Sequence, residues 1–386
     1  MKGWHKRKLN EVCELINGRA YSKPELLSDG KYPVLRVGNF FTNNHWYYSD
    51  LELEERKYCD TGDLLYAWSA SFGPRIWTGG KVIFHYHIWK VAPDPLLIDK
   101  KFLFHFLSWD TEKIKIDQGA GTTMIHVSKS SMDERDILLP PLPEQHRIVA
   151  ILDTAFDHIA TARANCEANL LNARAIFESH LQAVFTQRGD GWVEKKLSDL
   201  SRINYGYTES ASWAQVGPKF LRITDIQDNR VDWPSVPFCL IDMNDAPKYK
   251  LADGDIVFAR TGATTGKCYL VVEPPDAVFA SYLIRVQLRA KDLLPQFVNF
   301  FFQTPSYWES IRAGVSGSAQ GGFNATKLGE LVIPFPQSPK AQMTIIAKLN
   351  EILVETQRLE SLYQRKLQAL DDLKKSLLHQ AFSGLL

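Results

Sequence analysis

The chain has 386 residues, of which 45% are apolar, and its formal net charge at pH 7 is +1. This length indicates more than one domain, and the apolar share excludes a globally disordered protein. Because no run of about 18 uninterrupted apolar residues occurs and no apolar core of a signal peptide follows the basic N-terminus, we expect a cytoplasmic protein without a membrane span.

The sequence repeats itself with a period of nearly 200 residues, visible as short segments that match in the same order in both halves. The matches are residues 4–9 with 192–197, 35–37 with 221–223, 62–67 with 254–259, 119–123 with 317–322, and 139–143 with 333–336. The repeat predicts four regions in chain order. They are a domain over residues 1–139, a helical region over 140–188, a second domain over 189–337 and a second helical region over 338–386.

Each of the two domains has the composition of a mixed α+β fold. Short runs rich in β-branched and aromatic residues, bounded by turn signals, predict strands, and one phenylalanine-rich segment per domain predicts a helix. The predicted strands are residues 81–84, 87–91, 255–258 and 283–288, and the predicted helices are 103–107 and 297–302. Most other residues differ between the copies, so two similar scaffolds would present different surfaces.

Residues 144–188 and 340–383 follow the proline clusters and contain no Gly or Pro, which predicts two long helices. Apolar residues recur in them at steps of four and three, and such a stripe favours a partner helix. The residues expected to pack this pair are Ile148, Leu152, Ile159, Ile345, Leu349, Ile352, Leu359 and Leu367. We predict an α+β protein with two mixed domains in tandem, separated by an antiparallel coiled-coil spacer with pseudo-two-fold symmetry. The alternative is that each helix packs only on its own domain.

No motif for catalysis or metal binding is complete in this sequence. Residues 261–267 resemble a phosphate-binding loop, but three residues instead of four separate the glycines, and Cys268 stands where a hydroxyl would bind Mg²⁺. A tight turn between strands and a polar loop that faces DNA both remain open for this segment. His85 and His87 alternate on a predicted strand, and two histidines alone are weak evidence for a metal site. We therefore predict no catalytic residue, metal or cofactor on this chain.

Polar, basic and aromatic side chains in both domains suit contact with DNA. Asn pairs bidentately with adenine, Arg pairs with guanine, and Lys neutralises phosphates. The candidates are Asn39, Asn43, Asn44, His45, Trp68, Ser69, Arg75, Thr122 and Lys129 in the first domain, and Arg260, Thr261, Thr264, Lys267, Ser318, Gln320 and Lys327 in the second. Residues 1–139 carry 19 basic and 18 acidic side chains, and residues 192–339 carry 15 of each, so a basic face depends on how these charges are distributed.

The order of domain, helix, domain and helix resembles the specificity subunits of type I restriction–modification systems over essentially the whole chain. The motifs that carry the resemblance are LLPPLPEQ at 138–145, RIVAILD at 147–153 and GDIVFARTGATTGK at 254–267. The resemblance implies two target-recognition domains that each read half of a bipartite double-stranded DNA site, and helices that set the gap. It also implies docking of two methyltransferase (modification) subunits and of restriction/translocase subunits, which would carry S-adenosylmethionine, Mg²⁺ and ATP.

The same resemblance implies partner contacts where the two long helices begin. The candidates are Pro143, Glu144, Gln145, Arg147 and Gln342. The second copy reads Lys-Ala-Gln where the first reads Glu-Gln, so the two docking ends need not be equivalent. The alternative functions are a duplicated DNA-binding regulator, the specificity module of another defence system, a self-sufficient nuclease or methyltransferase, and a scaffold without a nucleic-acid role.

Overall fold

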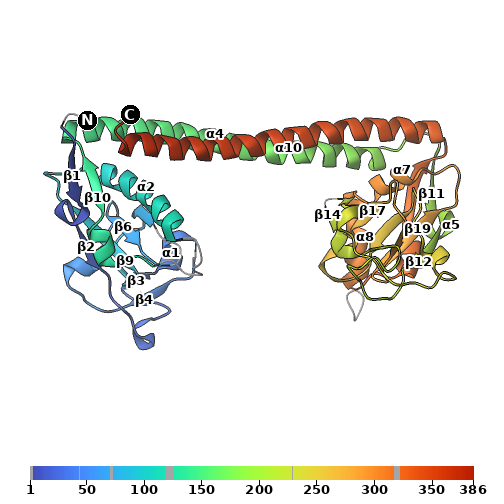
Figure 1. The fold of residues 1–386 in the computed structure, drawn as a ribbon, viewed down its shortest axis with the longest axis horizontal. Coiled ribbons are helices and arrows are strands. Elements are labelled where there is room, and N and C mark those ends of the chain that lie inside the picture. The colour runs from blue at the N-terminus through green and yellow to red at the C-terminus, as the bar shows by residue number, and fades with distance from the viewer. Residues whose placement is uncertain (1–2, 43, 70–72, 119–125, 228, 317–321) are drawn as a thin grey trace. The chain divides into compact units, whose positions relative to one another are not determined.

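A computed structural model describes residues 3–42, 44–69, 73–118, 126–227, 229–316 and 322–386. The chain forms two compact units, which we call unit 1 (residues 1–167 and 364–386) and unit 2 (residues 168–363). The long helices α4 (Leu142–Thr186) and α10 (Pro339–Phe382) each contribute one part to each unit (Figure 1).

Unit 1 combines two four-stranded sheets, a two-stranded ribbon and three shorter helices. Its helices are α1 (Val37–Phe41), α2 (Lys100–Gln118) and α3 (Lys129–Asp133). Its strands are β1 (His5–Lys8), β2 (Cys13–Asn17), β3 (Tyr32–Leu35), β4 (Tyr47–Ser49), β5 (Tyr58–Cys59), β6 (Leu64–Ala67), β7 (Gly73–Ile76), β8 (Val82–Phe84), β9 (Ile88–Pro93) and β10 (Asp136–Leu139). The sheet orders are β2-β9-β6-β7 and β4-β3-β8-β5, and β1 pairs with β10.

Unit 2 repeats this plan, except that two two-stranded sheets take the place of the second four-stranded sheet. Its helices are α5 (Leu197–Leu200), α6 (Ala246–Tyr249), α7 (Pro295–Phe301), α8 (Pro305–Ser316) and α9 (Ala325–Gly329). Its strands are β11 (Trp192–Lys196), β12 (Ser201–Tyr205), β13 (Lys219–Leu221), β14 (Ile226–Gln227), β15 (Arg230–Val231), β16 (Ile256–Ala259), β17 (Cys268–Leu270), β18 (Ala277–Phe279), β19 (Leu283–Leu288) and β20 (Val332–Pro336). The four-stranded sheet has the order β12-β19-β16-β17, and β11 pairs with β20.

The strand registers show that the two units share one frame. Ala67 faces Ile88 across β6 and β9, and Ala259 faces Leu283 across β16 and β19. The parallel pair β3–β8 likewise corresponds to the parallel pair β13–β18. Residues can therefore be matched between the units by register as well as by sequence.

One glycine in each unit lies where the backbone approaches another chain segment closely. A Cβ on Gly18 would lie 2.4 Å from the carbonyl oxygens of Phe84 and His85. A Cβ on Gly206 would lie 2.2 Å from the carbonyl oxygen of Ala280 in the matching place. Such distances are far inside van der Waals contact, so only glycine fits this junction of the two sheets.

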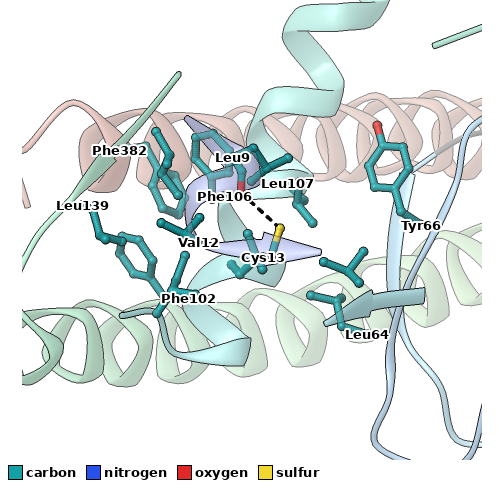
Figure 2. Close-up of a cluster of buried hydrophobic side chains, with 14 of the residues drawn as sticks. Leu9, Val12, Cys13, Leu64, Tyr66, Phe102, Phe106, Leu107, Leu139 and Phe382 are labelled. Atoms are coloured by element: carbon teal, nitrogen blue, oxygen red, sulfur yellow. Dashed lines mark hydrogen bonds between the residues drawn. The ribbon is translucent and has the colours of Figure 1, made fainter. Parts of the chain in front are cut away.

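The end of one long helix packs into the core of each unit. In unit 1, Phe382 of α10 lies against Phe102 and Phe106 of α2, with ring centroids 5.3 and 5.7 Å apart (Figure 2). In unit 2, Phe185 of α4 lies against Phe297 of α7 at 5.2 Å. Burial of large aromatic side chains fixes these helix ends, because each removes a large apolar area from water.

The two long helices pair antiparallel inside each unit. In unit 1, Ile148 and Leu152 belong to the same buried cluster as Phe382, and Arg163 of α4 forms an ion pair of 2.5 Å with Asp371 of α10. The predicted helix pairing is confirmed within the units, and the alternative of two helices packed only on separate domains is wrong. The half-buried partners in α10 are Ile345, Ile352, Leu359 and Leu367, whereas Ile159 and Leu349 are buried.

Most predicted elements are confirmed, with two corrections. The strands and the phenylalanine-rich helices lie where the sequence placed them, although α2 extends to Gln118. His85 and His87 are not on a strand, because the Ile88 amide donates to the His85 carbonyl and closes a turn between β8 and β9. The long helices begin a residue or two earlier than predicted, at Leu142 and Pro339, because proline is well tolerated in a first helical turn.

Candidate nucleic-acid interface

Several of the candidate DNA-contact side chains lie on loops at one end of the equivalent sheets of the two units. In unit 1 the Trp68 amide donates to the carbonyl of His87, and in unit 2 the Arg260 amide donates to the carbonyl of Tyr282. The same backbone bond therefore places Trp68 and Arg260 at equivalent positions. Arg36 and Arg222 also match, since they directly follow the parallel strands β3 and β13. The two units thus carry different side chains at the position of Trp68 and Arg260, and the same residue type at the position of Arg36 and Arg222.

Unit 1 has a cavity of about 290 Å³ in this region. The described residues that line it are cationic or neutral, and none of them is a carboxylate. They are Arg36, Val37, Gly38, Asn39, His45, Tyr47, His85 and His87. The side-chain amide of Asn39 donates to the His45 backbone carbonyl at 2.7 Å. This bond joins two residues that were each predicted from the sequence as DNA-contact candidates. A recess of this kind suits a polar ligand rich in hydrogen-bond acceptors.

Two histidines of this cavity, His85 and His87, have lowered pKa values. Burial, followed by the nearby His87 and then Arg36, lowers the pKa of His85 to about 4. Burial, followed by the nearby His126 and then Arg36, also lowers the pKa of His87. Both rings are therefore mainly neutral at pH 7, with one donor and one acceptor nitrogen each. The acceptor Nδ1 of His85 already accepts from the His87 backbone amide at 3.5 Å.

Trp68 is fixed beside the cavity by an aromatic stack. Its ring lies parallel to that of Trp89 at 5.8 Å, and Trp89 stacks on Tyr66 at 5.9 Å. The indole N–H of Trp68 donates to the Tyr86 carbonyl at 2.8 Å, and the ring meets His87 edge-on at 4.9 Å. This indole donor is therefore already used, so the part of the Trp68 ring that remains exposed is apolar.

Unit 2 presents a cation and an exposed phenol ring at the same end. The guanidinium of Arg260 lies over the ring of Tyr205 at 4.8 Å, and Tyr282 is 63% exposed. Thr261 and Lys267 flank a single 3-10 turn between the antiparallel strands β16 and β17, so the tight-turn interpretation of 261–267 is confirmed. Of this segment, Lys267 is exposed, whereas Thr261 and Thr264 are half-buried.

The remaining DNA candidates are placed less favourably or lie outside the description. Arg75 donates to the Phe40 carbonyl, Lys327 donates to the Gly314 carbonyl at 2.7 Å, and Ser69 is buried. Asn44 and Lys129 are exposed. Asn43, Thr122, Ser318 and Gln320 lie outside the described residues.

Two of the predicted partner contacts are wrong, because the structure buries Gln145 and Gln342 completely. The Gln145 side chain accepts from the Asp99 amide and donates to the carbonyls of Leu97 and Pro140, at 2.8 to 2.9 Å. Their hydrogen-bonding capacity is spent inside the units, so they tie each long helix to its domain.

Gln342 makes the same three bonds in unit 2, to the Leu294 amide and the carbonyls of Asp292 and Pro336, at 2.7 to 2.9 Å. The other partner candidates sit on the outside of unit 1. Pro143 is exposed, and Arg147 pairs with Glu144 at 2.8 Å and donates to the Leu386 carbonyl.

Arg36, Tyr47 and Tyr205 also belong to this site, although none of them was predicted from the sequence. Arg36 stood inside a repeat match that we used only for alignment, and it lies beside the cavity only because β3 runs parallel to β8. In the described residues no group of three or more His, Cys, Asp or Glu side chains could hold a metal ion. Among the described helices, none is long and apolar enough to cross a membrane.

Comparison with known proteins defines the class. The family model of the type I restriction modification DNA specificity domain matches twice, over residues 1–168 and 189–367, which covers most of the chain. The chain therefore belongs to the family of type I restriction–modification DNA specificity subunits. The duplicated family match coincides with the duplicated frame of the two units.

Individual relatives agree with this assignment. The chain is 25% identical to the EcoKI specificity subunit of Escherichia coli K12, over 99% of this chain and 89% of that protein. It is 24% identical to the MjaVIII specificity subunit of Methanocaldococcus jannaschii, over 83% of this chain and 78% of that protein.

Two solved structures share the fold. A chain solved in a study of complex assembly and conformational transition of the type I R-M system superposes with a TM-score of 0.82 at 18% identity, over 100% of this chain and 99% of that one. The HsdS subunit from Thermoanaerobacter tengcongensis gives 0.60 at 18% identity, over 100% of this chain and 98% of that one.

Proposed function

We propose that this chain reads a bipartite double-stranded DNA site for a type I restriction–modification complex, with one half-site for each unit. The observation that carries the proposal is the shared frame with unlike side chains at one end. Trp68 and His87 in unit 1 stand where Arg260 and Tyr282 stand in unit 2, and the arginine that both units share, Arg36 or Arg222, is paired with a carboxylate only in unit 2 among the described residues. Two readers built alike and lined differently suit two different base sequences.

The long helices act as the spacer between the half-sites in this proposal. α4 has 45 residues, so it is about 65 Å long at 1.5 Å per residue. Support comes from the way each helix end is held, by a buried glutamine at its start and a buried phenylalanine at its end. A stiff connection between two weak readers raises their joint affinity only when the gap in the DNA fits.

The proposed partners carry the chemistry. The relatives are specificity subunits of restriction enzymes. We propose that two methylation subunits dock on this chain, that restriction subunits join them, and that S-adenosylmethionine, Mg²⁺ and ATP bind those subunits. This chain would catalyse no step. It would hold the duplex while a methylation subunit extrudes the adenine.

Long-read methylation mapping of cells with and without this gene tests the function. We expect a split motif of two short half-sites, separated by a fixed gap, that is methylated only when the gene is present. A genome with unchanged methylation would overturn the proposal. Tight operator binding by the purified chain alone, without a methylation subunit, would favour a duplicated regulator instead.

Changing the gap tests the spacer. Duplexes with the gap shortened or lengthened by one base pair should lose methylation. Base substitutions within the gap that keep its length should leave methylation unchanged. Methylation that is indifferent to gap length would remove the spacer role and leave the two readers in place.

A further inference from the structure

We infer that Arg36 reads a guanine in the half-site contacted by unit 1, through paired hydrogen bonds to the base edge in the major groove. This inference rests on the proposed function and adds a specificity-determining residue to it. Guanine presents two acceptors, N7 and O6, in the plane of the base, and the planar fork of a guanidinium matches them.

The setting of Arg36 leaves its guanidinium available to DNA. The side chain is exposed at the rim of the cavity, and no ion pair with a carboxylate is recorded for it in the part of the chain that the structure describes. Its guanidinium lies over the ring of Tyr47, with the central carbon 5.3 Å from the ring centroid. Contact with the ring restrains the guanidinium, so less conformational freedom is lost when it binds.

The rest of the cavity favours a neutral base edge with acceptors. Among the described residues, the lining contains no carboxylate, and Arg36 is the one permanently charged side chain in it. The His85 and His87 rings lie 4.9 Å apart beside it, and both stay neutral at pH 7 because burial disfavours their charged forms. One fixed cation among neutral donors suits a single base better than a doubly contacted phosphate.

Unit 2 supplies the contrast at the matching position. There Arg222 pairs with Asp225 through two hydrogen bonds of 2.7 and 3.0 Å, and Asp225 also accepts from the Arg222 amide at 2.8 Å. The charge of Arg222 is therefore compensated inside its own turn. The same frame position serves the local fold in unit 2 and is open to DNA in unit 1.

The first test is methylation mapping of cells that express the full chain with its methylation subunits. With Arg36→Gln, one half-site should accept any base at one former guanine, while the other half-site and the gap stay unchanged. The control Arg7→Gln, at an exposed arginine of β1 outside the cavity lining, should leave both half-sites as they are. If neither half-site changes, or if the position that Arg36→Gln relaxes is an A·T pair in the wild-type motif, the inference is wrong.

The second test uses the purified complex and duplexes in which that guanine is replaced by 7-deazaguanine, which lacks the N7 acceptor. The analogue keeps O6, so one of the two hydrogen bonds to the guanidinium is lost. Wild-type binding should weaken roughly 10-fold to 150-fold, as is typical for loss of a hydrogen bond to a charged group, whereas Arg36→Gln should not distinguish the two duplexes. The unchanged reading of the other half-site shows that the variant is folded.

The outcomes separate the sources of an arginine contact. If Arg36→Gln weakens binding equally for all sequences and lowers the salt dependence by about one ion, Arg36 contacts a phosphate and the inference is wrong. If no split motif depends on the gene at all, the proposed function fails and the inference fails with it. A split motif that persists unrelaxed in Arg36→Gln overturns the inference alone.

Discussion

Units 1 and 2 are each stabilised by equivalent hydrogen bonds to the backbone, but the charged side chains at equivalent positions differ. The buried glutamines at the starts of α4 and α10 make identical sets of three hydrogen bonds. About two turns later, Asp153 of α4 binds Lys101 and His105 at 2.5 and 2.8 Å. The matching Asn350 of α10 meets only a neutral amide, that of Gln296 at 3.3 Å.

A second pair of equivalent contacts differs in burial. Lys90 and Asp63 lie 2.7 Å apart in unit 1 and are each about one-quarter exposed. Arg285 and Asp255 occupy the same register in unit 2, 3.6 Å apart, and both are almost fully buried. The comparison teaches that the glutamine bonds to the backbone are the same in both units, whereas the burial and separation of equivalent charged pairs differ.

Removing the buried cation should have the largest effect. Arg285→Met leaves the Asp255 carboxylate unpaired and frees the carbonyls of Lys250 and Lys248, so we expect a loss of about 3–5 kcal/mol in the free energy of unfolding of unit 2. Lys90→Met should cost unit 1 only about 1 kcal/mol because its partner stays hydrated. Peptide-resolved hydrogen exchange measures each unit separately. Equal losses in the two units, or a similar loss for the exposed control Arg289→Met, would contradict this.

Removing the glutamine ties should have the next largest effect, and an equal one in both units. Gln145→Ala and Gln342→Ala each leave one buried and two part-buried backbone groups without these partners, which should cost about 2–4 kcal/mol. Urea unfolding followed by hydrogen exchange in each unit checks this, with the exposed Gln357→Ala as the control. If only one unit is destabilised, the two ties are not equivalent.

Exchanging the carboxylate for its counterpart should have a smaller effect. Asp153→Asn gives unit 1 the residue of unit 2 and removes the ion pair with Lys101, so we expect a loss of about 1 kcal/mol that shrinks at high salt. The reverse change, Asn350→Asp, should bring no gain because Gln296 supplies no positive charge. Unfolding at two salt concentrations compares them, and stabilisation by Asn350→Asp would show that a cation lies nearby after all.

At neutral pH the smallest effect should come from His85, whose titration lowers the stability of unit 1 only as the pH falls. In the unfolded chain His85 titrates near 6.5, whereas in the folded unit burial, then His87 and Arg36, lower its pKa to about 4. The unfolded state therefore takes up the proton first as the pH falls. The stability of unit 1 should be complete above about pH 6.5 and decrease between pH 6.5 and 4.

His85→Ala introduces the residue that unit 2 carries at the matching position, Ala280. The variant should flatten the decrease in unit 1, and unit 2 should serve as the internal control. An NMR titration of His85 with a midpoint near 6.5 would contradict the expected shift directly.

Much of the frame followed from the sequence because it depends on local signals. Proline before a helix, apolar steps of four and three, and repeated Gly-Asp turns each specify backbone geometry near the residues that carry them. The long helices and most strands were therefore predicted correctly. The turn at His85 and His87 was not, because one bond from the Ile88 amide decides between turn and strand.

The site was predicted less completely because tertiary pairing assembles it. Asn39 and His45 were chosen for their chemistry, and the structure places both at one cavity. Arg36 was missed because only the parallel pairing of β3 with β8 brings it to His85. Gln145 and Gln342 were misassigned because a glutamine in a family motif gives no sign of whether it faces a partner or the interior.

The close approach at Gly18 and Gly206 limits how this protein can be recombined. A graft that transfers the loops of one unit into the other must place its joints so that glycine is kept where the backbone passes the two carbonyl oxygens. With that residue retained, the strands on either side keep their register whatever loop sequence follows. New target sequences should therefore be obtainable by exchanging whole loops, whereas any side chain at these two points would force the sheets apart and spoil donor and recipient alike.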